Sequence, residues 1–312
     1  MNISSTPSGS PSIQAGCSKD AMNGNPFDDE RAIRHSNYFV IKGGKPVLLA
    51  DPAMPCSLQD AAIAGAFRGF IQAPQFSCVG ARSAVMCDSY RLGIYGMLGS
   101  PEATAGLARD LYTFTREAET IGSGEFVTFA TFFREPAGVD EKGFEELLWS
   151  QLRELNRYDA LHFDWDPAVS SDPQSPHFSF SFAGRALFVV GLHPHSSREA
   201  RRFPWPGLVF NPHAQFVRLR EEGRWERFQK IIREREKALQ GSLNPNLADY
   251  GTISEARQYS GRRVEADWQP PFGSRESRVE GRESGVHDAR VAGARSQSAP
   301  RCPFHSPLPP DS

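Results

Sequence analysis

The sequence predicts an α+β domain in which a mainly antiparallel sheet is covered by helices on one face. Two observations support this prediction. Apolar residues recur at helical spacing in the first half of the chain, whereas short apolar runs typical of strands dominate between residues 177 and 219. Helices that come first and strands that come later favour an α+β fold. A chain of 312 residues can form one large domain or two small ones, and without an internal repeat we expect a single domain.

Both ends of the chain differ in composition from the middle. Residues 1–29 are rich in Ser, Pro, Gly and Asn, and residues 273–312 mix Arg, Glu, Gly and Ser with few large apolar side chains. Such segments bury too little apolar surface to offset the entropy lost on ordering. The sequence therefore predicts disordered N- and C-terminal tails around a folded body spanning residues 30–272.

Helical spacing predicts the first elements of the body. The first helix is expected over Ser57–Ile71, where the Ser57 hydroxyl can cap the N-terminus. Two more helices are expected over Arg82–Leu98 and Glu102–Ile121. Pro101 can open the second of these at its first turn.

The pattern then changes toward strands. Glu125–Phe133 is β-branched and aromatic, which indicates a buried strand. Asp140–Tyr158 returns to helical spacing. A β-hairpin follows, with alternating Phe residues and a turn at Ala183-Gly184. The expected hairpin strands are His177–Phe182 and Arg185–Leu192. Two later strands are expected over Gly207–Phe210 and Ala214–Leu219, and a final amphipathic helix over Arg224–Gln240.

Composition limits the classes of partner. The formal net charge is −2, whereas nucleic acid and anionic membranes usually select a strongly basic face, so we expect neither partner. No run of about 18 apolar residues suggests a membrane span, and the N-terminus lacks a signal-peptide pattern. The five cysteines are scattered and odd in number, which favours a reducing cytoplasm over a disulfide framework.

Three histidines gather between Val189 and Gln215. His193 ends a predicted strand, His195 follows in the next loop, and His213 stands between two later strands. Histidine is a common metal ligand and transfers protons near neutral pH, and loops after strands often carry sites. Surface histidines without a ligand explain the same pattern, and no carboxylate at a companion spacing supports a zinc site.

Four strings in this region resemble a known family. They are FSCVGARSA at residues 76–84, GLHPHSSR at 191–198, LVFNPHAQF at 208–216, and QGSLNP with QYSG at 240–245 and 258–261. Their order and spacing resemble the YqcI/YcgG family from about residue 56 to residue 272. The sequence departs from the family pattern at Ser77, where Pro is expected, and at Pro270, where Cys is expected before Pro-Phe.

The resemblance implies a haem protein. Members of that family include haem-dependent N-hydroxylases of guanidine compounds, among them enzymes of guanitoxin biosynthesis and of the cycloserine pathway. By this resemblance the protein would bind haem b and hydroxylate a nitrogen of a guanidine- or amine-containing small molecule. Electrons would come from a donor protein, or peroxide would serve as the oxidant, because no GxGxxG motif for a flavin or nicotinamide is present.

The resemblance also suggests which residues hold the haem. His193 is the first candidate for the iron ligand and His213 the second, with a core histidine or a turn residue as the alternative for each. Cys78, just before the helix expected at Arg82, is the sulfur candidate, where the helix N-terminus and Arg82 would favour a thiolate; a buried core cysteine is the alternative. For the haem propionates the candidates are Arg198, Arg201 and Arg202.

Two catalytic candidates remain, together with two other function classes. Glu199 is the carboxylate nearest the histidine loop, and Tyr259 lies in one of the family-like strings. One other class is a non-catalytic haem carrier or sensor that uses Cys302-Pro303. The other is a haem-free metalloenzyme that uses the three histidines. A homodimer is compatible with the sequence.

Overall fold

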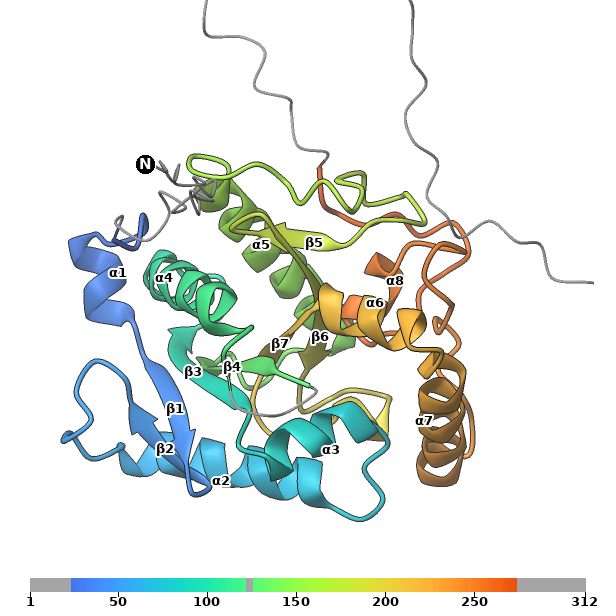
Figure 1. Cartoon of the computed structure of the whole chain (residues 1–312), viewed down its shortest axis with the longest axis horizontal. Helices are drawn as coiled ribbons and strands as arrows, with labels where there is room; N and C mark the ends of the chain where they lie inside the picture. The colour runs from blue at the N-terminus through green and yellow to red at the C-terminus, as the bar shows by residue number, and fades with distance from the viewer. Residues whose placement is uncertain (1–23, 122–125, 274–312) are drawn as a thin grey trace, which may run out of the picture. The chain divides into compact units, whose positions relative to one another are not determined.

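The computed structural model describes residues 24–121 and 126–273, and the expected tails before residue 24 and after residue 273 lie outside the described residues. In the described part, seven strands form one sheet in the order β2-β1-β3-β4-β7-β6-β5 (Figure 1). Among these seven strands of the described residues, only β3 and β4 pair in parallel. The α+β fold with a mostly antiparallel sheet is therefore confirmed. The strands are β1 (Tyr38–Lys42), β2 (Lys45–Leu48), β3 (Tyr90–Met97), β4 (Thr128–Glu135), β5 (Phe180–Phe182), β6 (Arg185–Leu192) and β7 (Gly207–Pro212).

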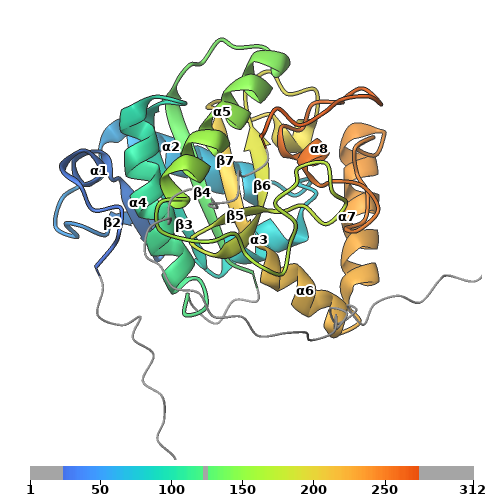
Figure 2. The same cartoon turned by 90° about the horizontal axis from the view of Figure 1, so that it is seen from above.

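Helices cover both faces of the sheet (Figures 1 and 2). On one face lie α4 (Pro101–Glu117) and α5 (Glu141–Asp159), and on the other lie α2 (Leu58–Gln72) and α3 (Val79–Met86). The expectation that helices cover a single face is wrong. The central strand β4 shows why: Phe129 and Phe133 face the first core, while Ala130 and Phe132 face the second. A strand buried on both faces needs a layer on each side.

Of the remaining helices, one precedes β1 and the others follow β6 in the sequence. They are α1 (Glu30–His35), α6 (His213–Glu221), α7 (Trp225–Gln240), α8 (Ala256–Tyr259) and a 3₁₀ turn over Glu199–Arg201. No residue of α7 is fully buried. The Arg235 guanidinium ties this helix to the carbonyl oxygens of Pro74 and Phe76. α7 therefore lies over the body as an outer layer.

Local signals predicted three helix starts correctly. The Ser57 hydroxyl accepts a hydrogen bond from the Asp60 N–H at 3.1 Å, and α2 begins at the next residue. Pro101 is the first residue of α4. The Asp140 carboxylate caps α5 at the Gly143 N–H, 2.7 Å away. Each cap satisfies a backbone donor that has no partner inside the helix.

The predicted hairpin is also present. β5 pairs with β6 in antiparallel register, with Phe180 opposite Leu187. Both turn residues have positive φ, 54° at Ala183 and 71° at Gly184. This is the backbone shape that joins two strands through a two-residue turn with the right twist.

Two predicted elements are wrong. The helix expected over Arg82–Leu98 ends at Met86, and after a turn at Asp88 the chain continues as β3 between β1 and β4. Pairing at the centre of the sheet outweighs the helical spacing of this apolar stretch. The strand expected over Ala214–Leu219 is the helix α6, in which Gln215 and Leu219 are buried one turn apart.

The N-terminal part contributes elements that the sequence analysis did not predict. β1 and β2 form an antiparallel hairpin at one edge of the sheet. Residues 24–29 already belong to the packed body, because Phe27 is buried in the first core. The buried Asp110 carboxylate accepts hydrogen bonds from Ser36, Asn37 and Tyr95, so it fastens this part to α4. Glu125, the first residue of the predicted strand, lies outside the described residues.

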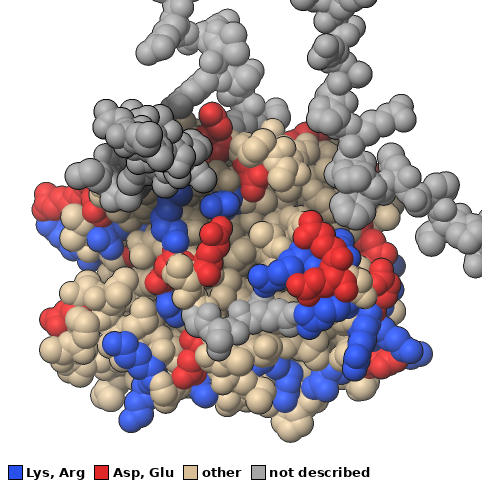
Figure 3. Space-filling model, viewed as in Figure 1, with Lys and Arg blue, Asp and Glu red and all other residues tan. Residues whose placement is uncertain are grey.

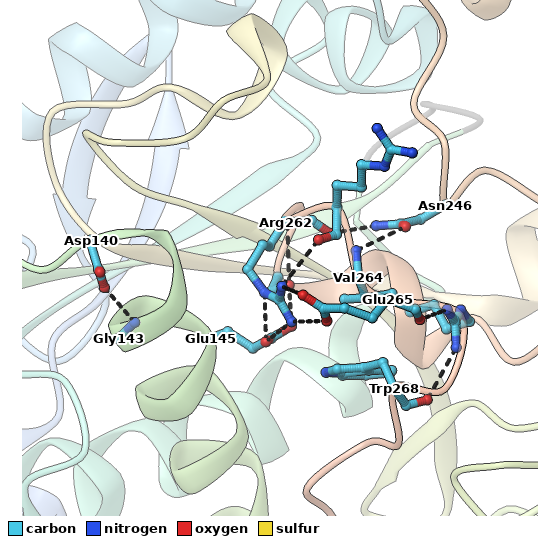
Figure 4. A network of polar contacts seen from close by, with 11 residues as sticks. Asp140, Gly143, Glu145, Asn246, Arg262, Val264, Glu265 and Trp268 are labelled. Atoms are coloured by element: carbon cyan, nitrogen blue, oxygen red, sulfur yellow. Dashed lines mark hydrogen bonds and ion pairs between the residues drawn. The ribbon is translucent and has the colours of Figure 1, made fainter.

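The C-terminal segment is held against α5 by an ion pair (Figure 4). The Arg262 guanidinium lies 2.8 Å from the Glu145 carboxylate of α5 and 2.9 Å from Glu265. Beyond this point Trp268 and Phe272 pack against Trp149, with ring centroids 6.1 and 5.8 Å away. These contacts bring the segment after α8 back to the first core.

The surface carries charges of both signs. On the face shown in Figure 3, acidic and basic side chains are interspersed rather than gathered into one broad area of a single sign. Within the described ranges, no helix is both long enough and apolar enough to cross a bilayer.

Candidate functional site: a cavity between the sheet and helix α7

A cavity of about 270 Å³ lies between the β6–β7 part of the sheet and helices α2, α3, α6 and α7. Its volume is slightly below the usual range of small-molecule pockets, roughly 300–1,000 Å³. One face of α7 forms a wall, because residues 225, 228, 229, 232, 233 and 236 line the cavity at helical spacing. Much of the remaining lining is apolar and includes Phe67, Phe76, Val190, Val209 and Phe216.

His213 lies in the wall of this cavity, at the first position of α6. Its side chain is 7% exposed, and its Nδ1 atom has no hydrogen-bond partner among the described residues. Burial and, to a smaller extent, the charge of Arg220 together lower the pKa of His213 to about 4. The imidazole is therefore neutral at pH 7, which is the form that ligates metals.

Cys78 lies in the same cavity and caps α3, where its Sγ accepts the Ala81 N–H at 3.5 Å. Burial raises the pKa of the Cys78 thiol, although the amides of Ala81 and Gly80 and the charge of Arg201 act against this. The guanidinium of Arg82 instead donates to the carbonyl oxygens of Gln72 and Ala73. Cys78 is therefore a thiol at neutral pH, contrary to the thiolate that the sequence suggested.

Two of the predicted propionate partners line the cavity. Arg198 donates to the Glu236 carboxylate at 2.6 Å and to the Ser242 carbonyl at 2.9 Å, while its buried Nε has no partner in the described chain. Arg201 donates to the carbonyl oxygens of Gly191, Gln258 and Tyr259. Burial lowers the pKa of Arg201 to about 10, so it remains protonated at neutral pH. Arg198 thus retains a donor, whereas Arg201 supports the backbone.

Arg202 and Glu199 are not among the cavity-lining residues. They pair with each other at 2.8 Å, and their side chains are 47% and 43% exposed. A surface pair of this kind contributes little to stability. The structure therefore places these two predicted site residues away from the others.

His193 also lies apart from the cavity. It is fully buried, its ring stacks on Phe144 of α5, and neither ring nitrogen has a hydrogen-bond partner among the described residues. Burial lowers its pKa to about 4. His195 is exposed in the following loop. The described part of the chain contains no group of three or more His, Cys, Asp or Glu residues arranged to hold a metal ion.

Glu255 is a cavity residue that the sequence analysis did not identify. One carboxylate oxygen, Oε1, accepts hydrogen bonds from the Ser179 hydroxyl at 2.8 Å and from the Tyr259 hydroxyl at 2.6 Å. Burial raises the pKa of Glu255 to about 7. Tyr259 is fully buried and also accepts the Phe180 N–H. Of the two predicted catalytic residues, Tyr259 therefore donates a hydrogen bond to the cavity residue Glu255, whereas Glu199 pairs with Arg202 outside the cavity.

Arg220 of α6 is a second residue that was missed. Its guanidinium lies 4.2 Å from the ring centroid of Trp225 and 5.6 Å from that of Tyr250, and all three residues line the cavity. The sequence does not indicate Arg220 itself, but it does indicate the neighbouring wall of the cavity formed by α7. Trp225, Phe228 and Ile232 form an apolar stripe on an otherwise charged helix, and such a stripe faces the interior.

Known proteins match the region that forms this cavity. The uncharacterized protein YqcI of Bacillus subtilis (strain 168) is 30% identical to this chain over 185 residues, which is 57% of this chain and 71% of that protein. No solved structure matches the chain. The sequence profile of the YqcI/YcgG family matches residues 67–273, a range that includes every residue lining the cavity. The chain therefore belongs to the YqcI/YcgG family.

Proposed function

We propose that this protein is a haem b-dependent monooxygenase that hydroxylates a nitrogen of a guanidine- or amine-containing small molecule. The observation that supports it best is that two buried atoms, His213 Nδ1 and Arg198 Nε, have no hydrogen-bond partner among the described residues, and both residues line one cavity. A buried polar atom without a partner is costly. Haem iron can bind a neutral imidazole and haem propionates can accept hydrogen bonds from a guanidinium, so one bound cofactor would provide partners for both residues.

In this proposal His213, rather than His193, would ligate the haem iron. His213 lines the cavity and is neutral, whereas His193 is stacked on Phe144 away from it. Cys78 is a weaker candidate, because burial raises its pKa. The apolar side chains of the wall would exclude water from the porphyrin faces. The bound haem would supply oxygen activation with electrons from a donor protein, or with peroxide.

In this proposal Glu255, rather than the predicted Glu199, is the carboxylate that binds the substrate nitrogen. Its carboxyl group lies in the cavity wall, so it can accept a proton from the substrate nitrogen or hold its positive charge. Its pKa of about 7 allows both protonation states near neutral pH. Tyr259 acts as a positioning residue, because its hydroxyl donates to Glu255 at 2.6 Å. The free cysteines Cys56, Cys78 and Cys87 support action in a reducing cytoplasm.

Absorption spectroscopy of protein from haem-supplied cells tests the proposal. We expect a stoichiometric Soret band and a CO-bound spectrum typical of imidazole ligation. His213→Ala should lose the band or lose its imidazole signature, while the control His193→Phe keeps both. A chain ending at residue 273 should bind haem equally well, because the proposed ligand His213 lies in the folded body. The carrier alternative predicts that this chain loses haem binding, because it uses Cys302, which lies outside the described residues. Failure of the full-length protein to bind haem would overturn the proposal.

Turnover is measured separately. Reconstituted protein is mixed with 4-guanidinobutanoate and peroxide, or with 4-guanidinobutanoate, oxygen and a reductase system, and the products are analysed by mass spectrometry. An N-hydroxylated product supports a monooxygenase. Haem binding without oxidation of any guanidine or amine would instead favour the carrier or sensor class.

A further inference from the structure

Two opposite charges face the cavity without pairing. Arg220 comes from α6 and Glu255 from the residue before α8, and both line the cavity. Each is close enough for its charge to shift the pKa of the other. Within the described residues, however, no hydrogen bond or ion pair joins them.

Arg220 keeps its hydrogen-bond donors available. Its guanidinium contacts the rings of Trp225 and Tyr250, and no carboxylate in the described chain forms an ion pair with it. A guanidinium held on aromatic faces leaves its N–H groups in the plane of the group free to donate. Two parallel N–H bonds from that plane match the geometry of a carboxylate.

Glu255 keeps one acceptor available. Both hydrogen bonds that it receives go to Oε1, from Ser179 and Tyr259. Oε2 accepts none from the described residues. The Tyr259 hydroxyl is itself fixed by the Phe180 N–H at 3.0 Å. The carboxyl group is therefore held in one orientation and has one oxygen left for a ligand.

We propose that Arg220 and Glu255 form a two-charge subsite, in which Arg220 binds a carboxylate of the ligand and Glu255 binds its cationic nitrogen. The inference rests on the proposed function in one respect: the cation is the guanidine or amine to be hydroxylated. A ligand with a single charge leaves one of the two protein charges without a partner in a cavity with many apolar side chains in its wall. The subsite therefore selects ligands that carry both charges.

Calorimetric binding at pH 8 tests this selectivity. The probes are 4-guanidinobutanoate, which has both charges, propylguanidine, which lacks the carboxylate, and butanoate, which lacks the cation. We expect the wild-type protein to bind 4-guanidinobutanoate at least tenfold more tightly than either half. Equal or weaker binding of 4-guanidinobutanoate would overturn the inference without any variant.

Two substitutions separate the two charges. Arg220→Gln should reduce the affinity for 4-guanidinobutanoate at least tenfold and leave propylguanidine unchanged. Glu255→Gln keeps an oxygen for Ser179 and Tyr259, and should weaken 4-guanidinobutanoate and propylguanidine while leaving butanoate unchanged. Arg233→Gln is the control, because that cavity arginine already lies 3.5 Å from Asp249. An equal effect of Arg233→Gln on selectivity would contradict the assignment.

The Soret band of the same preparations separates this inference from the proposed function. Haem binding without selectivity for both charges would overturn the subsite alone. Selectivity in a protein that binds no haem would overturn the haem proposal alone.

Discussion

The imidazole of His193 stacks on the ring of Phe144, with 4.4 Å between the centroids and 20° between the planes. The histidine is fully buried, and neither ring nitrogen has a hydrogen-bond partner among the described residues. Its ring thus packs as an aromatic side chain of the interior. A proton on such a ring has no hydrogen-bond acceptor, so protonation and folding oppose each other.

This opposition predicts a stability that depends on pH. The pKa of His193 is lowered from 6.5 to about 4 in the folded protein, so between these values the unfolded chain binds more protons. The stability is present above pH 6.5 and is lost as the pH falls toward 4, by about 3 kcal/mol. In urea titrations, His193→Phe should remove this part of the slope. A slope identical to that of the wild type would contradict the account.

Glu255 should act in the opposite direction. Burial raises its pKa from 4.5 to about 7, so between these values the folded protein binds more protons than the unfolded chain. Its contribution to stability is therefore present below pH 4.5 and is lost as the pH rises to 7. Relative to Glu255→Gln, the wild-type free energy of unfolding should fall by about 3 kcal/mol between pH 4 and pH 8. A difference that stays constant over this range would refute the predicted shift.

The ion pair between Arg262 and Glu145 should contribute strongly to stability (Figure 4). The side chains are 14% and 6% exposed, so Arg262→Ala leaves a buried carboxylate without its partner. We expect a loss of roughly 3 kcal/mol in chemical denaturation. Glu265→Gln is the matched control, because Glu265 is 63% exposed and pairs with the same arginine; it should cost less than about 1 kcal/mol. Equal losses for the two variants would contradict this ranking.

Gly191 should not tolerate a methyl group. A Cβ there would meet side-chain atoms of Leu148 and Phe144 at 2.8 Å and the Tyr259 carbonyl oxygen at 2.9 Å. Overpacking of this kind costs roughly 1–3 kcal/mol, and the backbone oxygen cannot easily move away. Gly96→Ala, with open space around its Cβ, should leave the melting temperature nearly unchanged. Thermal unfolding of both variants provides the comparison.

Caps and turns made much of the fold predictable. Ser57, Pro101 and Asp140 mark helix starts through local hydrogen bonds or a fixed φ, and Ala183-Gly184 marks a hairpin. Residues 82–98 were misassigned because the pairing of β3 between β1 and β4 depends on distant strands. Local spacing cannot report such a contact.

The site was less predictable than the fold. His193 and His213 occur in similar Pro-flanked strings, yet one packs into a core and the other lines the cavity. Glu255 and Arg220 had no distinctive local pattern. They become notable only because the chain returns after α7 and brings the Glu255 segment beside α6. Burial and unused hydrogen-bond capacity are tertiary properties, and they identify these residues.

Helix α7 has no fully buried residue, and its apolar stripe of Trp225, Phe228 and Ile232 borders the cavity. Whatever molecule binds there completes the packing of that stripe. Part of the ligand's binding free energy therefore goes into stabilising α7, so ligand binding and local unfolding of α7 are linked equilibria. Amide hydrogen exchange along residues 225–240 therefore reports whether the cavity is occupied. A bound ligand packs against one face of α7 and should slow exchange along the whole helix.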